Sequence, residues 1–402
     1  MSKQELIVLA LASLLFAVWP VPHTTTLREL LLLIGVCAAG YFYWRNRAVV
    51  HGPWWRELRV PLALFAALSV WMLLVALFVS PEPLWSLNEL RSQWLKATMA
   101  LALGGLVAGV SGQTETERRR LIVILIAVLL FHMIAIDVEA LTAFARKVAG
   151  HRAVGFTDGV DKANYLTNIA LAILIAEALT RLLHGKRLLP VPGWAVCVAA
   201  LVALYSLHAE RIRNGVGAVV VMLLCAVLIY LAEMLRRRMA LKRMTAVAVI
   251  AIVFAAVSML VMAGSAKPGA NWRQFIATVP VALDTQSHKG WINEQKYGLP
   301  TLPDGKTIDA SAYVRIAWFK EGLVLAREHP LGVGFGRNAF GHAITAKYNE
   351  PKGHSHSSFI DLLVGIGIPG MLLWLGFLGS LLWLAQRNFA GGGYVLFFVV
   401  VD

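Results

Sequence analysis

The sequence has few charged residues and few cysteines. Charged side chains make up 15% of its 402 residues, whereas 58% are hydrophobic. Soluble domains carry about 25% charged and 45–50% apolar residues, so this composition excludes an ordinary soluble enzyme and a disordered protein. Cys37, Cys197 and Cys225 lie in apolar runs and lack metal-ligand or Cys-x-x-Cys spacing. We predict that they are small buried residues, with neither a disulfide framework nor a zinc site.

Several motifs that drive chemistry are also missing. The sequence has no P-loop, no Asp-x-Asp pair in an external loop and no His/Cys/Asp cluster with metal-ligand spacing. These absences argue against an ATP-driven step and against metal-dependent sugar transfer. We therefore predict a reaction without a metal or a cofactor, in which the substrate supplies the energy.

Long apolar runs recur along the whole chain, each close to the 20 residues that a membrane-spanning helix needs. They cover residues 4–20, 28–44, 60–80, 93–110, 121–139, 165–182, 190–207, 215–235, 244–263, 357–385 and 390–402. No clean small-x-small cleavage site follows the first run, so we predict an uncleaved helix there. The last run ends at Asp402 without flanking basic residues, and we expect further helices beyond it. The predicted fold is all-α, a polytopic transmembrane bundle of about 11–12 helices.

The basic charge of the chain has a topological explanation. Lys and Arg number 37 against 23 Asp and Glu, a formal net charge of +14, which by itself suggests nucleic acid or an anionic membrane. With the N-terminus in the cytoplasm, the short loops on that side carry most of the short-loop Lys and Arg, as the positive-inside rule requires. We therefore predict membrane lipids as partners and no nucleic acid. Segments 140–164 and 264–356 then lie on the opposite side.

Segment 264–356 is long and polar enough to be a folded insertion. We predict a transmembrane bundle of about nine spans at 1–263, an extramembrane loop domain at 264–356 and C-terminal transmembrane helices at 357–402. Within the insertion, residues 314–328 read as an amphipathic helix capped near Asp309, and segment 276–306 has turn signals that include Pro280.

Two histidines stand at the external end of the run 357–385. On a helix, His354 and His356 would not share a face, so we expect one imidazole to point into a cavity and the other to pack or meet solvent. An imidazole with a pKa near 6.5 suits a general base at neutral pH. Upstream, the backbone N–H groups at Gly332, Gly334 and Gly336 either face an anion or form a plain turn.

Arginines outside the membrane break the rule that external short loops are poor in basic residues. Arg211 and Arg213 stand at the external junction of two spans, Arg315 in the long loop and Arg152 in segment 140–164. Either they contact lipid headgroups, or their guanidinium groups bind a pyrophosphate bidentately. A polyprenyl pyrophosphate-linked donor carries its own energy, because pyrophosphate leaves readily once its charge is neutralised.

These motifs resemble those of the bacterial O-antigen ligase family, in the group that also contains O-antigen polymerases. The ligase signature is His, then Asn, Ser or Gln, nine residues, Gly, two residues and Gly. It corresponds to His356-Ser357, Gly367 and Gly370, with Met371 where the family usually has Thr. The upstream Arg, Trp and His-Pro-x-Gly-x-Gly pattern corresponds to Arg315, Trp318 and the segment 329–334.

Two weaker matches complete the resemblance. The family's Arg at the end of a span, commonly followed by Gly, resembles Arg213-Asn214-Gly215, with Arg211 as a competing assignment. The segment from Arg152 to Asn164 resembles an Arg…Gly…Asn region of relatives.

The resemblance implies a GT-C-like glycosyltransferase in the bacterial inner membrane, with its active site facing the periplasm. It would transfer O-antigen from undecaprenyl pyrophosphate to a sugar hydroxyl of lipid A–core oligosaccharide, without a metal and with inversion. His356 would be the base, Arg213 and Arg315 would bind the pyrophosphate with support from Arg211 and Arg152, and His354 would orient His356 or contact the acceptor.

Two alternatives stay open. An O-antigen polymerase uses the same donor but a second undecaprenyl-linked glycan as acceptor. A lipid-linked glycan transporter would place charges along a path through the membrane, whereas we predict nearly apolar spans with His132 and Asp361 as the main exceptions.

Overall fold

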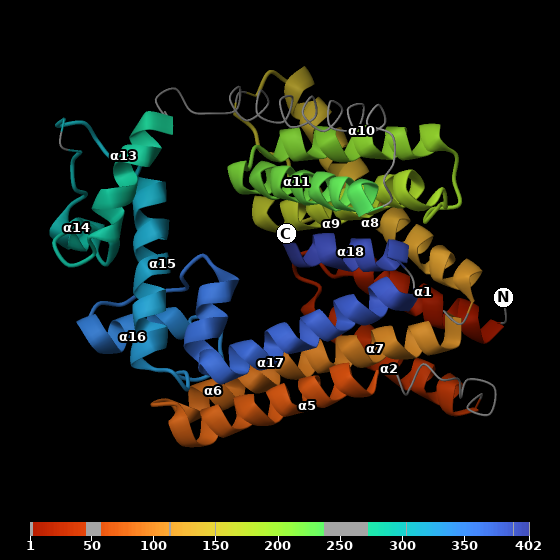
Figure 1. The fold of residues 1–402 in the computed structure, drawn as a ribbon, viewed down its shortest axis with the longest axis horizontal. Coiled ribbons are helices and arrows are strands. Elements are labelled where there is room, and N and C mark those ends of the chain that lie inside the picture. The colour runs from red at the N-terminus through yellow and green to blue at the C-terminus, as the bar shows by residue number, and fades with distance from the viewer. Residues whose placement is uncertain are drawn as a thin grey trace. The chain divides into compact units, whose positions relative to one another are not determined.

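The computed structural model describes residues 3–45, 58–111, 114–148, 150–236, 272–302, 304–388 and 390–401. These residues form helices and no strand, apart from one isolated bridge between Thr301 and Thr307 (Figure 1). The helices are α1 (Lys3–Val18), α2 (Thr25–Arg45), α5 (Arg59–Leu74), α6 (Pro83–Glu89), α7 (Leu95–Ser111), α8 (Glu115–Ala145), α9 (Val160–His184), α10 (Gly193–Glu210), α11 (Arg213–Arg236), α13 (Trp272–Leu283), α14 (Glu294–Tyr297), α15 (Ala310–Glu328), α16 (Ala339–Tyr348), α17 (Ser358–Asn388) and α18 (Ala390–Val401). The all-α prediction is confirmed.

Eight helical segments within these residues are long and apolar enough to cross a membrane. They correspond to the predicted runs between residues 28 and 110, between 121 and 235, and at 357–385. The first and last runs form the shorter helices α1 and α18, and the run 244–263 lies outside the described residues. Cys37 and Cys197 are exposed, so their predicted burial is wrong. An apolar residue of a membrane helix is equally suited to the lipid-facing side.

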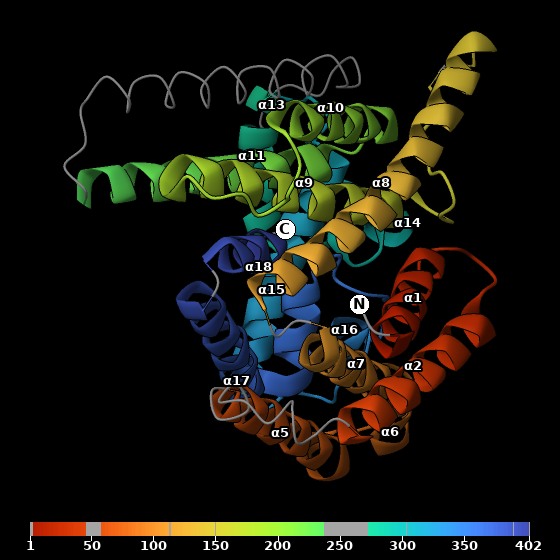
Figure 2. The same ribbon diagram turned by 90° about the vertical axis from the view of Figure 1, so that its right-hand side faces the viewer.

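The contacts divide the chain into two compact units. The first unit comprises Met1–Pro53, Met99–Ser265 and Leu382–Asp402. At its centre, α9 packs against α8, α10, α11 and α18. A smaller pair, α1 and α2, lies side by side (Figure 2). The predicted division at residues 263 and 356 stays a prediction.

Buried polar side chains in α9 contradict the prediction of nearly apolar spans. Thr167, Asn168, Glu177 and Thr180 are all buried. Glu177 has a local purpose, because its carboxylate accepts the backbone N–H groups of Leu188 and Leu189 at 2.7 and 2.9 Å. The apolar pattern of the sequence did not predict this role, because the backbone groups that Glu177 binds lie in the loop after the helix.

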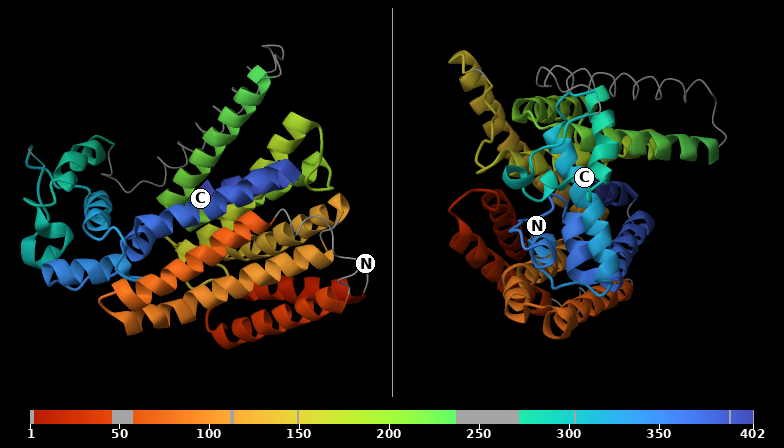
Figure 3. Two further views of the ribbon diagram at one scale, coloured as in Figure 1. Left: turned by 60° about the horizontal axis from the view of Figure 1, so that its bottom comes forward. Right: turned by 90° about the vertical axis from the view of Figure 1, so that its left-hand side faces the viewer.

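The second unit comprises Trp54–Thr98 and Ala266–Leu381. Here α13 and α15 lie side by side and run in the same direction, as Figure 3 shows (right). Gln274 Nε2 donates to Thr307 O at 2.6 Å near their starts, and Lys320 donates to Leu283 O near the end of α13. Their core includes the buried rings of Trp291, Tyr313, Trp318 and Phe340.

The predicted helix 314–328 is confirmed and begins earlier, at Ala310. Its cap is Asp309, whose carboxylate accepts the N–H of Ala312 at 3.1 Å. The predicted turn at Pro280 is wrong, because Pro280 lies inside α13. Apolar residues around it, such as Val281 and Ala282, pack into the core shared with α15, and this packing outweighs the missing N–H.

A backbone junction joins α17 to the segment before α16. At Gly367, φ is 68° and ψ is −176°, which breaks the helix and frees carbonyl groups of the preceding turn. Val333 N–H donates to Val364 O and Gly334 N–H to Gly365 O, both at 3.0 Å. In return, Ile368 N–H donates to Pro330 O at 2.9 Å.

The junction tests the hypothesis that the backbone N–H groups of the glycines in segment 332–336 face an anion. The N–H groups of Gly332 and Gly334 donate to His329 O and Gly365 O, so the anion-binding hypothesis is wrong for these two glycines. A Cβ on Gly332 would lie 2.4 Å from Gly365 O, and a Cβ on Gly367 would lie 2.5 Å from Pro330 O. The segment around Gly332 and the segment around Gly367 therefore pack against each other in one close backbone contact.

We predict that Gly367→Ala lowers the free energy of unfolding by about 2–4 kcal/mol, because it adds left-handed strain to a backbone clash. The measurement is the midpoint of thermal unfolding of the purified protein. Gly379→Ala is the matched control on the same helix, since a Cβ there meets nothing within 4 Å. Equal midpoints for the two variants would contradict the junction's role.

Candidate functional site

The two histidines lie in an extended loop rather than on a helix, because α17 begins at Ser358. Both are exposed, and His356 adopts a left-handed backbone with φ of 56°. The N–H of His356 donates to Nδ1 of His354 at 3.1 Å, and the ring centroids lie 4.1 Å apart. The expectation that the imidazoles point apart is wrong, because the left-handed residue turns the second ring back onto the first.

The imidazole of His356 rests on a buried tryptophan of α15. Its ring and that of Trp318 are stacked, with centroids 5.2 Å apart and planes inclined by 8°. Trp318 is fixed by the donation of its Nε1 to Trp291 O at 3.1 Å. Arg315 is exposed and precedes Trp318 by three residues, so both lie on neighbouring faces of one helical turn. The structure thus gathers His354, His356 and the helix turn of Arg315 in the second unit.

Lys352 joins this cluster and was missed by sequence reasoning. Its Nζ lies 4.8 Å from the centroid of Trp318, the ring that also contacts His356. The ammonium donates to Ile292 O at 3.0 Å, and burial lowers the pKa of Lys352. In the sequence, the only indication of a role for Lys352 is its position four residues before His356.

Arg152 and Arg211 lie on adjoining segments of the first unit. Ala153 N–H donates to Ala209 O at 3.3 Å, which ties the segment after α8 to the end of α10. Both arginines are exposed, and Arg211 ends α10 in a left-handed conformation with φ of 53°. Arg213 begins α11, but its side chain lies outside the described residues.

Two carboxylates that sequence reasoning missed support these arginine segments. Glu139 accepts the N–H groups of Val154 and Gly155 at 3.0 and 2.7 Å, and also contacts Nε2 of His151 at 2.7 Å. It therefore shapes the loop that carries Arg152. Its only signal in the sequence is an acidic residue at the external end of a long apolar run.

The second carboxylate, Glu210, is fully buried directly before Arg211. Its oxygens accept from Asn164 Nδ2 at 2.6 Å and from Thr167 Oγ1 at 2.5 Å. Asn164 in turn packs against Gly215, where a Cβ would lie only 2.1 Å from Nδ2. Gly215 is therefore required by the amide, and the segments of Asn164 and Arg213-Asn214-Gly215 meet as one packed unit.

Residues 191–375 match the family model described as O-Antigen ligase. This segment is an O-antigen ligase family domain. No curated protein matches the chain. The eight apolar helices among the described residues support a multi-pass membrane protein, and the match over residues 191–375 indicates an activity of the O-antigen ligase and polymerase type for that segment.

The family domain contains most, but not all, of the predicted site. Arg211, Arg213, Arg315, His354 and His356 fall inside residues 191–375, whereas Arg152 and its supporting Glu139 precede them. Arg152 and Arg211 belong to the first compact unit, and Arg315 and both histidines to the second. Among the residues that the structure covers, no three His, Cys, Asp or Glu side chains are grouped to hold a metal.

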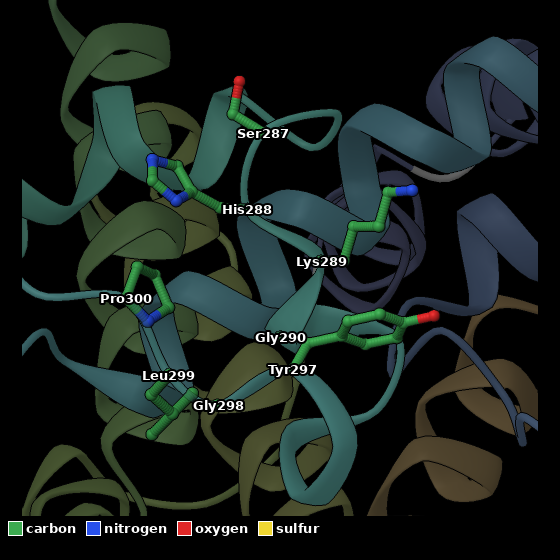
Figure 4. A pocket seen from close by; sticks show the side chains of 8 residues that line it. All are labelled: Ser287, His288, Lys289, Gly290, Tyr297, Gly298, Leu299 and Pro300. Atoms are coloured by element: carbon green, nitrogen blue, oxygen red, sulfur yellow. The ribbon is translucent and has the colours of Figure 1, made fainter.

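A small cavity of about 190 Å³ lies in the loop between α13 and α15 of the ligase family domain (Figure 4). Its lining residues are Ser287, His288, Lys289, Gly290, Tyr297, Gly298, Leu299 and Pro300. In Figure 4, Lys289 and Tyr297 lie on one side and Leu299 and Pro300 on the other, and no polar groups converge on a common point. We assign no ligand to it.

We predict that Gly215→Ala destabilises the first unit by about 1–3 kcal/mol, because its Cβ displaces Asn164 and breaks the hydrogen bond from that amide to the buried carboxyl group of Glu210. Gly217→Ala is the control two residues along the same helix, where a Cβ meets nothing within 4 Å. Thermal unfolding midpoints provide the measurement. Adding Gly215→Ala to Asn164→Ala should cost little more, and fully additive losses would refute this contact as the cause.

Proposed function

We propose that the protein is an O-antigen ligase of lipopolysaccharide biosynthesis. It transfers O-antigen polysaccharide from undecaprenyl pyrophosphate to a sugar hydroxyl of lipid A–core oligosaccharide, at the periplasmic face of the bacterial inner membrane. The observation that carries this proposal is the exposed imidazole of His356 stacked on Trp318, one helical turn from exposed Arg315. The family match over residues 191–375 supports the reaction class.

His356 acts as the general base. Its imidazole takes the proton of the acceptor hydroxyl while the acceptor oxygen forms a bond to the anomeric carbon of the donor sugar. The bond from that carbon to the pyrophosphate oxygen breaks, and the pyrophosphate leaves with the electron pair. Attack from the side opposite the leaving group inverts the anomeric carbon. No metal takes part in the proposed step.

His354 orients the base. Its Nδ1 accepts the backbone N–H of His356, which requires an unprotonated Nδ1. The neutral ring therefore carries its proton on Nε2 and presents one edge to the neighbouring imidazole. In this role His354 acts on the conformation of His356 and not on the acceptor.

The arginines neutralise the pyrophosphate. Arg315 binds its oxygens in the second unit, and Arg213, with Arg211 and Arg152, is proposed for the same role from the first unit. A guanidinium group suits this task because it stays charged and presents paired N–H donors to phosphate oxygens. The exposure of Arg152, Arg211 and Arg315 supports the proposal, since a side chain committed to the core is not accessible to a ligand. The extramembrane segment 264–356 then faces the periplasm.

We expect His356→Ala to lower the ligation rate by about 10²–10⁴-fold, the usual contribution of a positioned general base. The assay uses purified protein, undecaprenyl pyrophosphate-linked glycan and lipid A–core acceptor. His288→Ala is a histidine control in the same unit, and it should keep the wild-type rate. A folded His356→Ala protein that ligates at the wild-type rate would rule out the base assignment.

The acceptor separates the ligase from an O-antigen polymerase, which the family group also contains. We expect product only when lipid A–core is present, because the acceptor hydroxyl belongs to the core sugar. The measurement is gel analysis of labelled donor incubated with and without lipid A–core. Long glycan chains that form without lipid A–core would replace the ligase proposal with the polymerase.

A further inference from the structure

The proposed base, His356, lies on a loop, and contacts with the rest of the unit must hold that loop in place. His356 is exposed and holds a left-handed conformation that side chains with a Cβ rarely adopt. A general base must nevertheless meet its hydroxyl within a few tenths of an ångström of hydrogen-bonding distance. His354 contributes one contact, but it is itself exposed and lies on the same loop. Some other group must tie the loop to the body of the unit.

Asp361, in the first turn of α17, provides that tie. Its Oδ2 accepts both the N–H and the Oγ–H of Ser355, at 2.9 and 2.6 Å. Its Oδ1 accepts the N–H of Phe340, in the first turn of α16, at 3.3 Å. One carboxylate thus connects the histidine loop to the starts of two helices. An ionised carboxylate is suited to this task because both of its oxygens act only as acceptors.

Ser355 transmits the constraint to the base. It is buried, with 2% exposed, although it lies between two exposed histidines. Its Oγ donates to Asp361 and accepts the N–H of Ser357 at 3.1 Å. The Ser355 side chain therefore holds the peptide group that follows His356, His354 accepts the N–H of the peptide group before it, and the His356 ring is stacked on Trp318.

We propose that Asp361 is a positioning residue of the transferase, which fixes Ser355 and so holds the imidazole of His356 in its reactive place. This role rests on the proposed function of His356 as the base. Asp361 acts through the loop and touches neither substrate. Asp361 lies in the first turn of α17, from which its carboxylate reaches both Ser355 in the loop and Phe340 in α16.

The direct test is Asp361→Asn in the purified full-length protein. The amide keeps the size of the side chain but has one acceptor oxygen, so it cannot hold Ser355 and Phe340 together. We expect kcat to fall about 100-fold, as displacements of about 1 Å do, while KM for donor and acceptor stays within about threefold. Asp304→Asn removes an exposed carboxylate paired with Lys306 in the same unit and should keep the wild-type kcat. A similar loss in both variants would overturn the proposal.

A second comparison separates positioning from a general structural role. In a His356→Ala background, Asp361→Asn should change the remaining rate by less than about twofold, because the base that it positions is gone. A further large loss there, or a rise in KM that accounts for the whole effect, would overturn the proposal. Ser355→Ala keeps the backbone donor and the carboxylate, and we expect it to lose about tenfold in kcat.

The outcomes also distinguish this inference from the proposed function. Wild-type ligation by His356→Ala would remove the base itself. If His356→Ala is inactive and Asp361→Asn has nearly wild-type kcat, His356 remains the proposed base and only the positioning role of Asp361 is rejected. Where Asp361→Asn fails to fold, as judged by its thermal unfolding, Ser355→Ala decides: reduced kcat at unchanged KM supports the proposal, and wild-type kcat overturns it.

Discussion

The break of α17 at Gly367 and its backbone contact with Pro330–Gly334 are the constraint on which the histidine site depends. The break frees carbonyl groups that would be costly in an apolar surrounding without a donor. Val333 and Gly334 supply those donors, and Trp71 Nε1 donates to Ile366 O at 2.7 Å. The contact fixes the chain just after the end of α15 against the helix that begins beside His356. Trp318 and the imidazole can therefore meet at a reproducible distance.

In both units, carboxylates accept hydrogen bonds from backbone N–H groups of loops and so fix their conformation. Glu177 holds the N–H groups after α9, Glu139 those beside Arg152, and Asp361 that of Ser355. Hydrogen bonds to charged groups contribute about 1.5–3 kcal/mol each, enough to offset the strain of about 1–3 kcal/mol at a left-handed residue such as His356. These acids serve backbone groups at helix ends.

The sequence predicted the helices because spans and caps are local. Long apolar runs located the membrane helices, and Asp309 correctly indicated the cap of α15. Groups whose partners are distant in sequence escaped prediction. Glu210 looks like one more acid beside Arg211 until Asn164 and Thr167 reach it from α9. The glycines of segment 329–334 were expected to face an anion or to form a plain turn, whereas the carbonyl group that Gly334 N–H contacts is about thirty residues away on α17.

The arrangement of the two histidines follows from a division between exposed and buried groups. A base that meets a large glycan acceptor must stand in the open, whereas the contacts that hold it still are strongest away from water. The chain meets both needs by alternation: His354 and His356 are exposed, and Ser355 between them is buried against Asp361. A helix would not allow this contact between the rings, since residues two apart point in different directions. The left-handed turn at His356 is therefore the conformation that gives an accessible imidazole a fixed direction.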